Sequence, residues 1–363
     1  MQLILNEEYG KLTKPDDNCE SMTTASGFTT TPISTADLTN LLEPVTQDLA
    51  QVEIMLNTNM IDDSAFVGEL LAQIFQAGGK RLRPAIALLA SRATSRPDQE
   101  FSRLHLILAV LTELIHTASL VHDDVIDSAS LRRGKQTVNR RWNDKVAVLL
   151  GDLLFAQASI CLARIMNPVI VGIYGQVLGD LCAGEIRQMR AQYLTSVDWE
   201  AYIHKSFCKT ASLFAAASHS GAILNGCPNE TIESLKQYGR NLGILFQVVD
   251  DLLDVTGNTE QMGKEAGSDL QSGILTAPTL FVLERGDAAS KTLEELIKTR
   301  AINEPEGTQK ALTVIRESGG VEKTVEMARK YGRSAKDSLN VLQPSPYKTS
   351  LEELVDYILT RTT

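Results

Sequence analysis

The chain has 363 residues, of which 43% are hydrophobic and 22% are charged, a balance typical of a soluble globular protein with a large core. A net charge of -10 excludes a general binder of nucleic acid or of anionic membranes, so any phosphate binding must be local. Five cysteines without a Cys-x-x-Cys pair predict neither a disulfide framework nor a zinc site.

The first segment, residues 1–35, is rich in Ser and Thr, has several acidic residues and shows no secretory pattern. We expect a disordered tail on a cytoplasmic chain that is not secreted, with plastid targeting as the alternative that the Ser and Thr content leaves open. The apolar stretches 104–121 and 146–163 are each interrupted by polar or charged residues, so we expect buried helices and no transmembrane segment.

From residue 37 onward, apolar residues recur at helical spacing and no alternating strand pattern is found. Breaks are expected at Gly78-Gly79, Arg96-Pro97, Asn167-Pro168, Gly226 to Pro228, and Gly257 to Gly273. None of these breaks is typical of a linker between domains. The sequence therefore predicts an all-α protein with one domain over residues 36–363.

One motif, Asp-Asp-x-x-Asp, occurs twice, each time directly after an apolar helical stretch. Its carboxylates are Asp123, Asp124 and Asp127 in the first copy, and Asp250, Asp251 and Asp254 in the second. On a helix, residues four apart share a face, so crowded carboxylates need a cation between them. Hard oxygen ligands select Mg²⁺, or Mn²⁺ as the alternative, and Mg²⁺ favours substrate phosphates as its remaining ligands. A solvated helix end explains a single copy equally well, but explains two copies poorly.

Basic residues that could hold a phosphate lie near these motifs. Lys80, Arg81 and Arg83 follow a pair of glycines, and Arg132, Arg133 and Lys135 follow the first Asp motif. Glycine lets the backbone approach an anion, while Lys and Arg supply charge and hydrogen bonds. Either group alone is more simply explained as solvated surface charge; their position beside the Asp motifs favours phosphate binding.

In combination these motifs resemble the trans-isoprenyl diphosphate synthases, in particular the long-chain polyprenyl type represented by solanesyl and octaprenyl diphosphate synthases. The resemblance runs from about residue 66 to the C-terminus and rests on Gly-Gly-Lys-Arg-Leu-Arg-Pro, on both Asp motifs with their flanking residues, and on Arg-Arg-Gly, Lys-Thr and Gly-Ser-Asp-Leu. It implies a single domain of long antiparallel helices around a deep central cavity, with the two Asp clusters facing each other across its mouth. It also implies a homodimer.

The resemblance assigns roles residue by residue. As metal ligands it implies Asp123, Asp127 and Asp250, with Asp124, Asp251 and Asp254 completing the clusters, for more than one Mg²⁺ ion. The isopentenyl diphosphate subsite would comprise Lys80, Arg83, His116 and Arg133. The allylic diphosphate subsite would comprise Arg132, Lys209, Thr210, Gln247 and Lys264. Among these, Asp123, Asp127, Asp250, Lys209 and Lys264 would carry catalysis.

One departure from the family pattern is Ile274, where many relatives place a lysine in Gly-Lys-x-Thr. The loss leaves Lys209 and Lys264 to balance the allylic diphosphate. It therefore places substrate affinity in question.

The expected reaction joins isopentenyl diphosphate to an allylic primer, farnesyl or geranylgeranyl diphosphate. Stabilisation of the leaving diphosphate by metal ions and fixed cations would supply the catalysis, with no protein nucleophile. One turn before Asp123, the small residues Ala118 and Ser119 stand where short-chain members have Phe or Tyr, so the growing tail would pass. We expect a C40 to C50, solanesyl-like product for prenylquinones, released to a membrane.

Several alternatives stay open at this point. They are a shorter-chain geranylgeranyl-type synthase and a non-catalytic modulatory subunit of a heteromeric synthase. The second Asp motif argues against a class I terpene cyclase and against a phosphohydrolase of the His-Asp type. Close packing of helices is the other explanation for Ala118 and Ser119.

Overall fold

The computed structural model describes residues 35–58, 64–75, 79–96, 101–132, 134–257 and 266–361. The expected tail 1–35 lies outside this range except for Thr35, with which the first helix begins. The expected break at Gly257 to Gly273 also falls partly outside it.

The N-terminal part is helical. Its elements are α1 (Thr35–Leu41), the 3-10 helix η1 (Glu43–Val45), α2 (Thr46–Thr58), α3 (Ala65–Phe75) and α4 (Leu82–Thr94). A small antiparallel hairpin, β1 (Leu131–Arg132) with β2 (Lys135–Gln136), pairs Leu131 with Gln136 and is followed by α6 (Val138–Arg141). This hairpin is the only sheet among the described residues.

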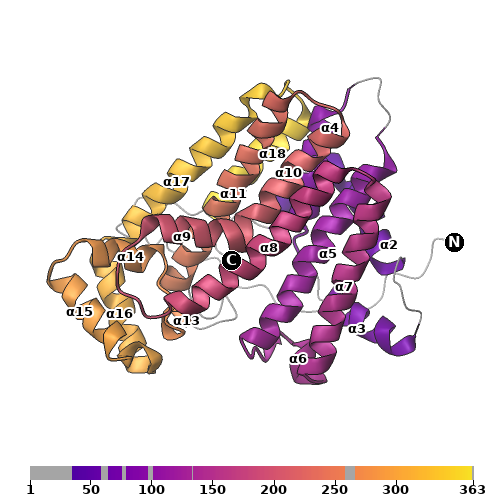
Figure 1. Cartoon of the computed structure of the whole chain (residues 1–363). Coiled ribbons are helices and arrows are strands. Elements are labelled where there is room, and N and C mark those ends of the chain that lie inside the picture. The colour runs from indigo at the N-terminus through magenta and orange to yellow at the C-terminus, as the bar shows by residue number, and fades with distance from the viewer. Residues whose placement is uncertain are drawn as a thin grey trace, which may run out of the picture.

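The long helices form the centre of the bundle (Figure 1). They are α5 (Arg103–Ile126), α7 (Asp144–Ile165), α8 (Pro168–Ala191), α10 (Ser212–Leu224) and α11 (Asn229–Thr256). Between α8 and α10 lie α9 (Trp199–Ser206) and one turn of π-helix, η2 (Phe207–Ala211). Helix α5 packs on α2, α4, α7 and α10, and most of its apolar side chains are buried, although Ile126 at its end is exposed.

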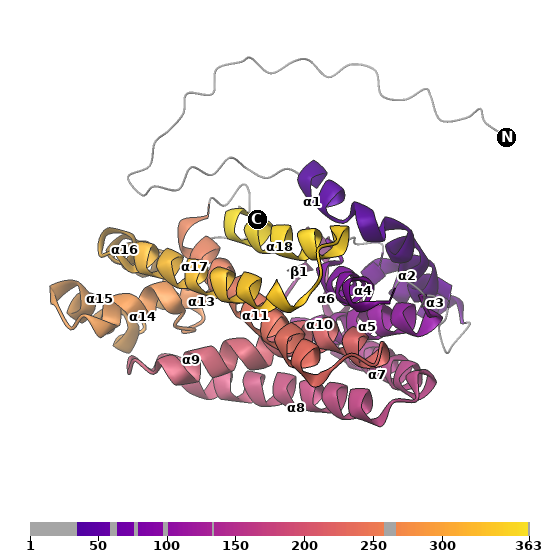
Figure 2. The same ribbon diagram turned by 90° about the horizontal axis from the view of Figure 1, so that it is seen from above.

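The C-terminal part closes the bundle at the end where α11 finishes. Its elements are α13 (Ser268–Gln271), α14 (Ala277–Glu284), α15 (Ala288–Lys298), η3 (Ala301–Asn303), α16 (Pro305–Glu317), α17 (Gly320–Ser338), η4 (Leu339–Val341) and α18 (Pro346–Thr360). Helix α17 packs along α11, and α18 packs on α4. Seen from above, α8 and α9 form one edge of the molecule and α1 and α18 the opposite edge (Figure 2).

The all-α prediction is confirmed, and so are the breaks at Asn167-Pro168 and Gly226 to Pro228. At the first of these breaks, Met166 ends α7 in a left-handed conformation and Asn167 caps α8 through its side chain. Both Asp motifs lie in the last turns of long helices, α5 and α11. The fold therefore places each motif where a helix leaves the core.

Candidate active site

The first Asp motif divides between two directions at the end of α5. Asp124 is buried and accepts a hydrogen bond from Arg132 Nε at 2.7 Å, which ties it to the hairpin. Asp123 and Asp127, four residues apart, share the other face. Burial raises the pKa of Asp123 to about 6; the charge of Lys209 opposes this shift and that of Glu185 adds to it. These two carboxylates are therefore the ones available to a cation.

A close helix contact holds this end of α5 in place. The ring of His122 lies over Gly151 of α7, where a Cβ atom would come within 2.1 Å of the imidazole Nε2. His122 Nε2 is 3.1 Å from the carbonyl oxygen of Val148, and its ring meets Phe155 edge to face. Glycine at 151 thus leaves the space that the imidazole of His122 occupies.

In the second motif, Asp251 is 1% exposed and is surrounded by protein donors. Its oxygens accept hydrogen bonds from the Tyr202 hydroxyl at 2.6 Å, from Gln247 Nε2 at 2.9 Å and from the Ala277 backbone N–H at 3.2 Å. Burial raises the pKa of Asp251, and these donors oppose the shift. Asp251 therefore joins α9, α11 and α14 rather than facing open space.

Asp254 has a similar structural setting. It accepts hydrogen bonds from the backbone and hydroxyl of Ser268 and from the backbone of Asp269, at the start of α13. Burial and the nearby Asp269 charge raise the pKa of Asp254 to about 6, against the effect of these donors. The carboxylate thus fixes the segment that returns to the site after α11.

Asp250, by contrast, is half-exposed and carries a salt bridge from Arg361, the residue that follows α18. The guanidinium of Arg361 also donates to the Phe246 carbonyl oxygen at 2.9 Å and lies 3.9 Å from the centre of the Phe246 ring. A cation from the C-terminal end is therefore already in contact with the second cluster.

Lys209 lies beside the first cluster and near Asp269, the neighbour of Asp254. It lies on the π-helical turn η2, an irregularity often found at functional sites, and its Nζ is 3.5 Å from Glu185. Burial disfavours its charge, yet nearby carboxylates outweigh burial and raise the pKa of Lys209. These carboxylates are Glu185, Asp123, Asp269 and Asp127. Asp123 and Asp127 belong to the first cluster, and the backbone of Asp269 donates to Asp254 of the second, so Lys209 lies between the first cluster and the segment that the second cluster holds.

The neighbours of Lys209 are fixed by packing and by hydrogen bonds. Gly184 lies so close to η2 that a Cβ atom there would come within 2.7 Å of the Cys208 Cβ, which sets Glu185 beside the lysine. Thr210 donates to Gln247 Oε1 at 3.1 Å, and Gln247 in turn donates to Asp251. The predicted group of Lys209, Thr210 and Gln247 is therefore brought together.

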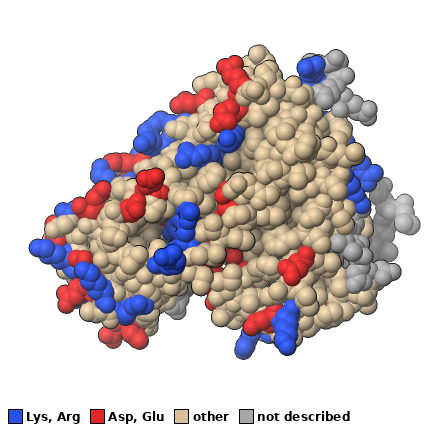
Figure 3. Space-filling model, in the orientation of Figure 1, with Lys and Arg blue, Asp and Glu red and all other residues tan. Residues whose placement is uncertain are grey.

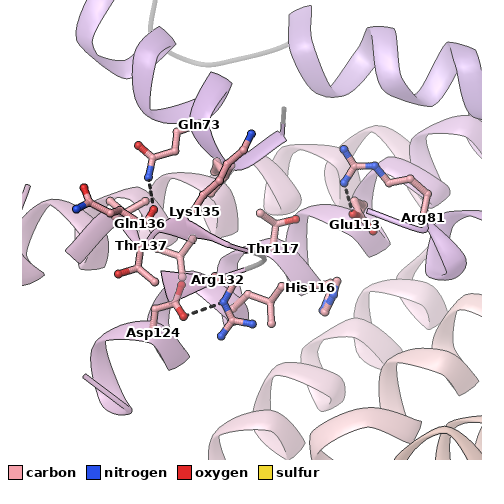
Figure 4. A pocket seen from close by; sticks show the side chains of 14 residues that line it. Gln73, Arg81, Glu113, His116, Thr117, Asp124, Arg132, Lys135, Gln136 and Thr137 are labelled. Carbon is pink, nitrogen blue, oxygen red and sulfur yellow. Dashed lines mark hydrogen bonds and ion pairs between the residues drawn. The ribbon is translucent and has the colours of Figure 1, made fainter. Parts of the chain in front are cut away.

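A small cavity of about 60 Å³ opens on the other side of α5, between α3 and the hairpin (Figure 4). Its wall includes His116, Asp124 and Arg132. Arg83 Nη1 donates to His116 Nε2 at 3.0 Å, so this predicted pair is also brought together. At the far end of the cavity, Arg81 turns to Glu113 and does not face the Asp cluster.

Three further predicted residues, Lys80, Ala118 and Ser119, lie within the described part of the chain. Lys80 is exposed, and its Nζ lies 5.7 Å from the centre of the Tyr357 ring. Ala118 is fully buried, whereas Ser119 is half-buried and donates to the His116 carbonyl oxygen at 2.9 Å. Arg133 and Lys264 lie outside the described residues.

Three residues of the site were missed from the sequence: Glu185, Tyr202 and Arg361. None belongs to a repeated or charged motif. Glu185 is one carboxylate on a mostly apolar helix, Tyr202 precedes Lys209 by two helical turns, and Arg361 is far from the other residues in sequence. Only the packing of α8, α9 and α18 on the rest of the bundle brings them to the clusters.

Within the described part of the chain, no three His, Cys, Asp or Glu side chains are close enough to hold a metal ion by themselves. The donor set nevertheless fits Mg²⁺, which takes one or two carboxylates and completes its shell with water and phosphate oxygens. Asp123, Asp127 and Asp250 offer such carboxylates. A diphosphate would supply the remaining oxygens.

A helical bundle with a carboxylate cluster at the end of each of two long helices, and a lysine beside the first, is typical of proteins that bind diphosphates through divalent ions. The family model for polyprenyl synthetase matches residues 64–315. A prenyl transferase from Synechocystis sp. is 43% identical over 89% of this chain and 98% of its own length. Solanesyl-diphosphate synthase 2, chloroplastic, from Oryza sativa subsp. japonica is 41% identical over 93% of this chain and 83% of its own length.

A solved structure agrees with these matches. Polyprenyl synthase from Caulobacter crescentus CB15, complexed with calcium and isoprenyl diphosphate, is 32% identical and superposes with a TM-score of 0.83, covering 92% of this chain and 100% of that chain. The chain therefore belongs to the polyprenyl synthetase family and is a prenyltransferase. The resemblance found from the sequence motifs is confirmed.

One expectation is wrong: that of a cytoplasmic chain with no segment long and apolar enough to cross a membrane. Three helices, α5, α7 and α8, meet that description by length and composition, because polar interruptions such as Glu113 and Asp152 are too few to prevent it. Helix α5 is mostly buried, whereas α7 and α8 leave much of their surface exposed. The rice relative, moreover, is chloroplastic.

Proposed function

We propose that this protein is a long-chain trans-polyprenyl diphosphate synthase, which extends an allylic diphosphate by repeated addition of isopentenyl diphosphate. The position of Lys209 carries this proposal, since it lies in the field of Asp123 and Asp127 from one cluster and of Asp269 beside the other. A cation between the carboxylates of the first cluster and the segment that follows the second is the arrangement expected around a bound diphosphate and its metal ions. The unit that performs the reaction is residues 36–363.

The proposed metal is Mg²⁺, with more than one ion for each site and Mn²⁺ as a substitute. Asp123, Asp127 and Asp250 would hold the ions, while Asp124, Asp251 and Asp254 support them through the hydrogen bonds described above. When bound, the ions neutralise charge that develops on the departing diphosphate. Arg361 bonds one oxygen of Asp250, so a metal ion on that carboxylate would compete with the guanidinium.

The two substrates would occupy subsites on either side of Asp123. Lys209 and its hydrogen-bonded neighbours Thr210 and Gln247 would contact the allylic diphosphate, together with Arg132 and Lys264. Arg83 and His116, already 3.0 Å apart, would contact isopentenyl diphosphate together with Lys80 and Arg133. The farnesyl or geranylgeranyl chain of the primer would lie along α5.

In the reaction, the allylic C–O bond breaks and its electron pair leaves with the diphosphate. The double bond of isopentenyl diphosphate forms the new C–C bond to the allylic carbon, and a proton leaves the resulting cation. We assign this proton to the released diphosphate, because no described side chain at the site has the geometry of a dedicated base. Lys209 and Arg132 then stabilise the leaving anion.

A long product, C40 to C50 for prenylquinones, is favoured by two observations. Ala118 and Ser119 keep the first turn below Asp123 free of large side chains, and the rice relative is named solanesyl-diphosphate synthase. A geranylgeranyl-type product is the shorter alternative, and a modulatory subunit is the non-catalytic one. So long and apolar a product would pass to a membrane on release.

A homodimer would cover the apolar surface of α7 and α8. Exposed large hydrophobic residues on these helices and their connections are Val148, Leu149, Ile160, Met166, Val169, Val171, Ile186, Met189 and Leu194. The space-filling view shows a broad area nearly free of charged side chains over these helices (Figure 3). Contiguous apolar surface of this kind marks an interface.

Light scattering tests the proposed homodimer. We expect the wild-type protein to have the mass of a dimer and Leu149→Lys to have the mass of a monomer. A monomeric wild-type protein would contradict the proposal.

The function is tested with purified protein, Mg²⁺, farnesyl or geranylgeranyl diphosphate, and labelled isopentenyl diphosphate, followed by separation of the dephosphorylated products by length. We expect a ladder ending in one dominant long prenol. A C20 end point would support the geranylgeranyl-type alternative. No incorporation with either primer, by folded protein, would contradict the enzyme proposal and favour a modulatory subunit.

A further inference from the structure

Among the described residues at the second cluster, Arg361 already forms a salt bridge with Asp250. Lys209 is engaged by Glu185 at 3.5 Å, and position 274 is the half-buried, neutral Ile274. The segment that carries Ile274 is nonetheless close to the second cluster. Its backbone N–H bonds to the Asp269 carbonyl oxygen at 2.9 Å, and three residues later the Ala277 N–H donates to Asp251. A diphosphate at this place would therefore be stabilised by a further positive charge.

Lys205 of α9 lies beside the same carboxylate. Its Nζ is 5.4 Å from the centre of the Tyr202 ring, and the Tyr202 hydroxyl donates to Asp251 Oδ2, the oxygen that also accepts from Ala277. Lys205 is half-buried, and no carboxylate of the described residues is within salt-bridge distance of it. It precedes Lys209 by about one helical turn, roughly 5.4 Å along the axis. Tyr202, which Lys205 contacts, and Ala277 therefore meet at the same oxygen of Asp251.

Lys205 is thus one residue removed from the second cluster, through Tyr202. A positive charge at this distance also acts on an anion held at the second cluster. Stacking over Tyr202 alone would leave the ammonium group with spare hydrogen-bond donors.

We infer that Lys205 is a further diphosphate-binding residue of the allylic subsite, where it supplies the positive charge that position 274 lacks. This inference rests on the proposed function. Its ammonium group would donate to a terminal oxygen of the allylic diphosphate. The isopentenyl diphosphate subsite, on the His116 side of α5, would not be affected.

The test compares four proteins: wild type, Lys205→Gln, Ile274→Lys and the double variant Lys205→Gln with Ile274→Lys. Titration calorimetry measures binding of inorganic pyrophosphate and of farnesyl thiolodiphosphate with Mg²⁺, and steady-state assays measure KM for each substrate. Lys205→Gln should weaken binding of both probes about tenfold, the loss of one charge-assisted hydrogen bond. KM for farnesyl diphosphate should rise, while KM for isopentenyl diphosphate stays the same.

The double variant Lys205→Gln with Ile274→Lys shows whether the two positions share one role. If the two positions share one role, Ile274→Lys restores most of the binding that Lys205→Gln loses, and adds little to wild type. If Ile274→Lys instead strengthens binding equally in both backgrounds, or if Lys205→Gln binds like wild type, the inference is overturned. Lys205→Arg keeps the charge and should keep the affinity, which separates the role of charge from that of folding.

Lys291→Gln serves as the matched control, because Lys291 is an exposed lysine on α15 away from the clusters. It should bind both probes as wild type does. The experiments distinguish a failure of the proposed function from a failure of the proposed role of Lys205. A wild-type protein that extends no primer contradicts the proposed function. A wild-type protein that extends the primer while Lys205→Gln matches it contradicts only the role of Lys205.

Discussion

Arg361 forms a salt bridge with Asp250, so that the last described residue of the chain contacts the second aspartate cluster. The guanidinium is 7% exposed and is held against the Phe246 ring, which makes this contact part of the packed structure rather than a loose surface pair. In the metal-free protein, Asp250 thus already has a cationic partner.

Removal of this cation should favour metal binding. Arg361→Gln leaves Asp250 without its positive partner, so we expect Mn²⁺ or Mg²⁺ to bind several-fold more tightly in the absence of diphosphate. Calorimetry or Mn²⁺ paramagnetic resonance measures this affinity. The control is Lys336→Gln, which breaks the exposed Lys336–Asp356 pair on α17 and α18. Equal metal affinity in Arg361→Gln and wild type would contradict the expectation.

Gly151→Ala should destabilise the protein. The added methyl group would lie 2.1 Å from His122 Nε2, and overpacking of this kind costs about 1–3 kcal/mol. Because His122 precedes Asp123, we expect turnover to fall as well. Gly68→Ala is the control, since its Cβ meets no atom within 4 Å and α3 should be unchanged or more stable. Urea unfolding and kcat measure both effects; a neutral Gly151→Ala would refute the packing argument.

Tyr202→Phe should lower both stability and activity. The substitution removes one donor from buried Asp251, at a cost of about 1–3 kcal/mol. It also loosens the contact that aligns the second cluster with α9. Tyr238→Phe is matched in burial, but its hydroxyl donates to the Leu351 carbonyl oxygen, far from the site. We expect Tyr238→Phe to lose stability without a change in KM, and equal kinetic losses in the two variants would contradict a specific role for Tyr202.

His219 should contribute to acid sensitivity. Burial on α10 lowers the pKa of its imidazole below the usual 6.5, so the folded state keeps it neutral while the unfolded chain takes up a proton. The unfolded state then binds more protons below pH 6.5, and the free energy of unfolding falls as the pH falls through that value. His219→Gln should show a shallower decline between about pH 8 and about pH 5. Parallel curves for the variant and wild type would contradict this assignment.

The sequence predicted the helical fold, and it identified the two Asp motifs as candidates, because helical periodicity and short motifs are local properties. The sequence could not show which carboxylate of each motif is held by protein donors and which is available to a cation. Asp250 and Asp251 are neighbours, yet one meets Arg361 and the other meets Tyr202 and Ala277, because successive residues on a helix point in different directions. Those partners come from helices far away in the chain, and only the packed structure identifies them.

The apolar character of α7 and α8 shows a second limit of the sequence. Their composition suited buried helices, but the fold leaves many of their apolar side chains exposed, among them Leu149 and Val169. Burial in a bundle depends on how many faces of a helix have neighbours, and no local pattern records that number. The proposed dimer would supply the missing neighbour.

The most direct test of a single diphosphate site shared by both Asp clusters is a crystal structure of the full chain with Mn²⁺ and farnesyl thiolodiphosphate. Anomalous scattering would locate the ions. We predict ions on the carboxylates of Asp123 and Asp127 and on that of Asp250, with the diphosphate between them, Lys209 within hydrogen-bond distance of its oxygens and Arg361 withdrawn from Asp250. Ions bound elsewhere, or a diphosphate held away from Lys209 by one cluster alone, would contradict a single site shared by both clusters.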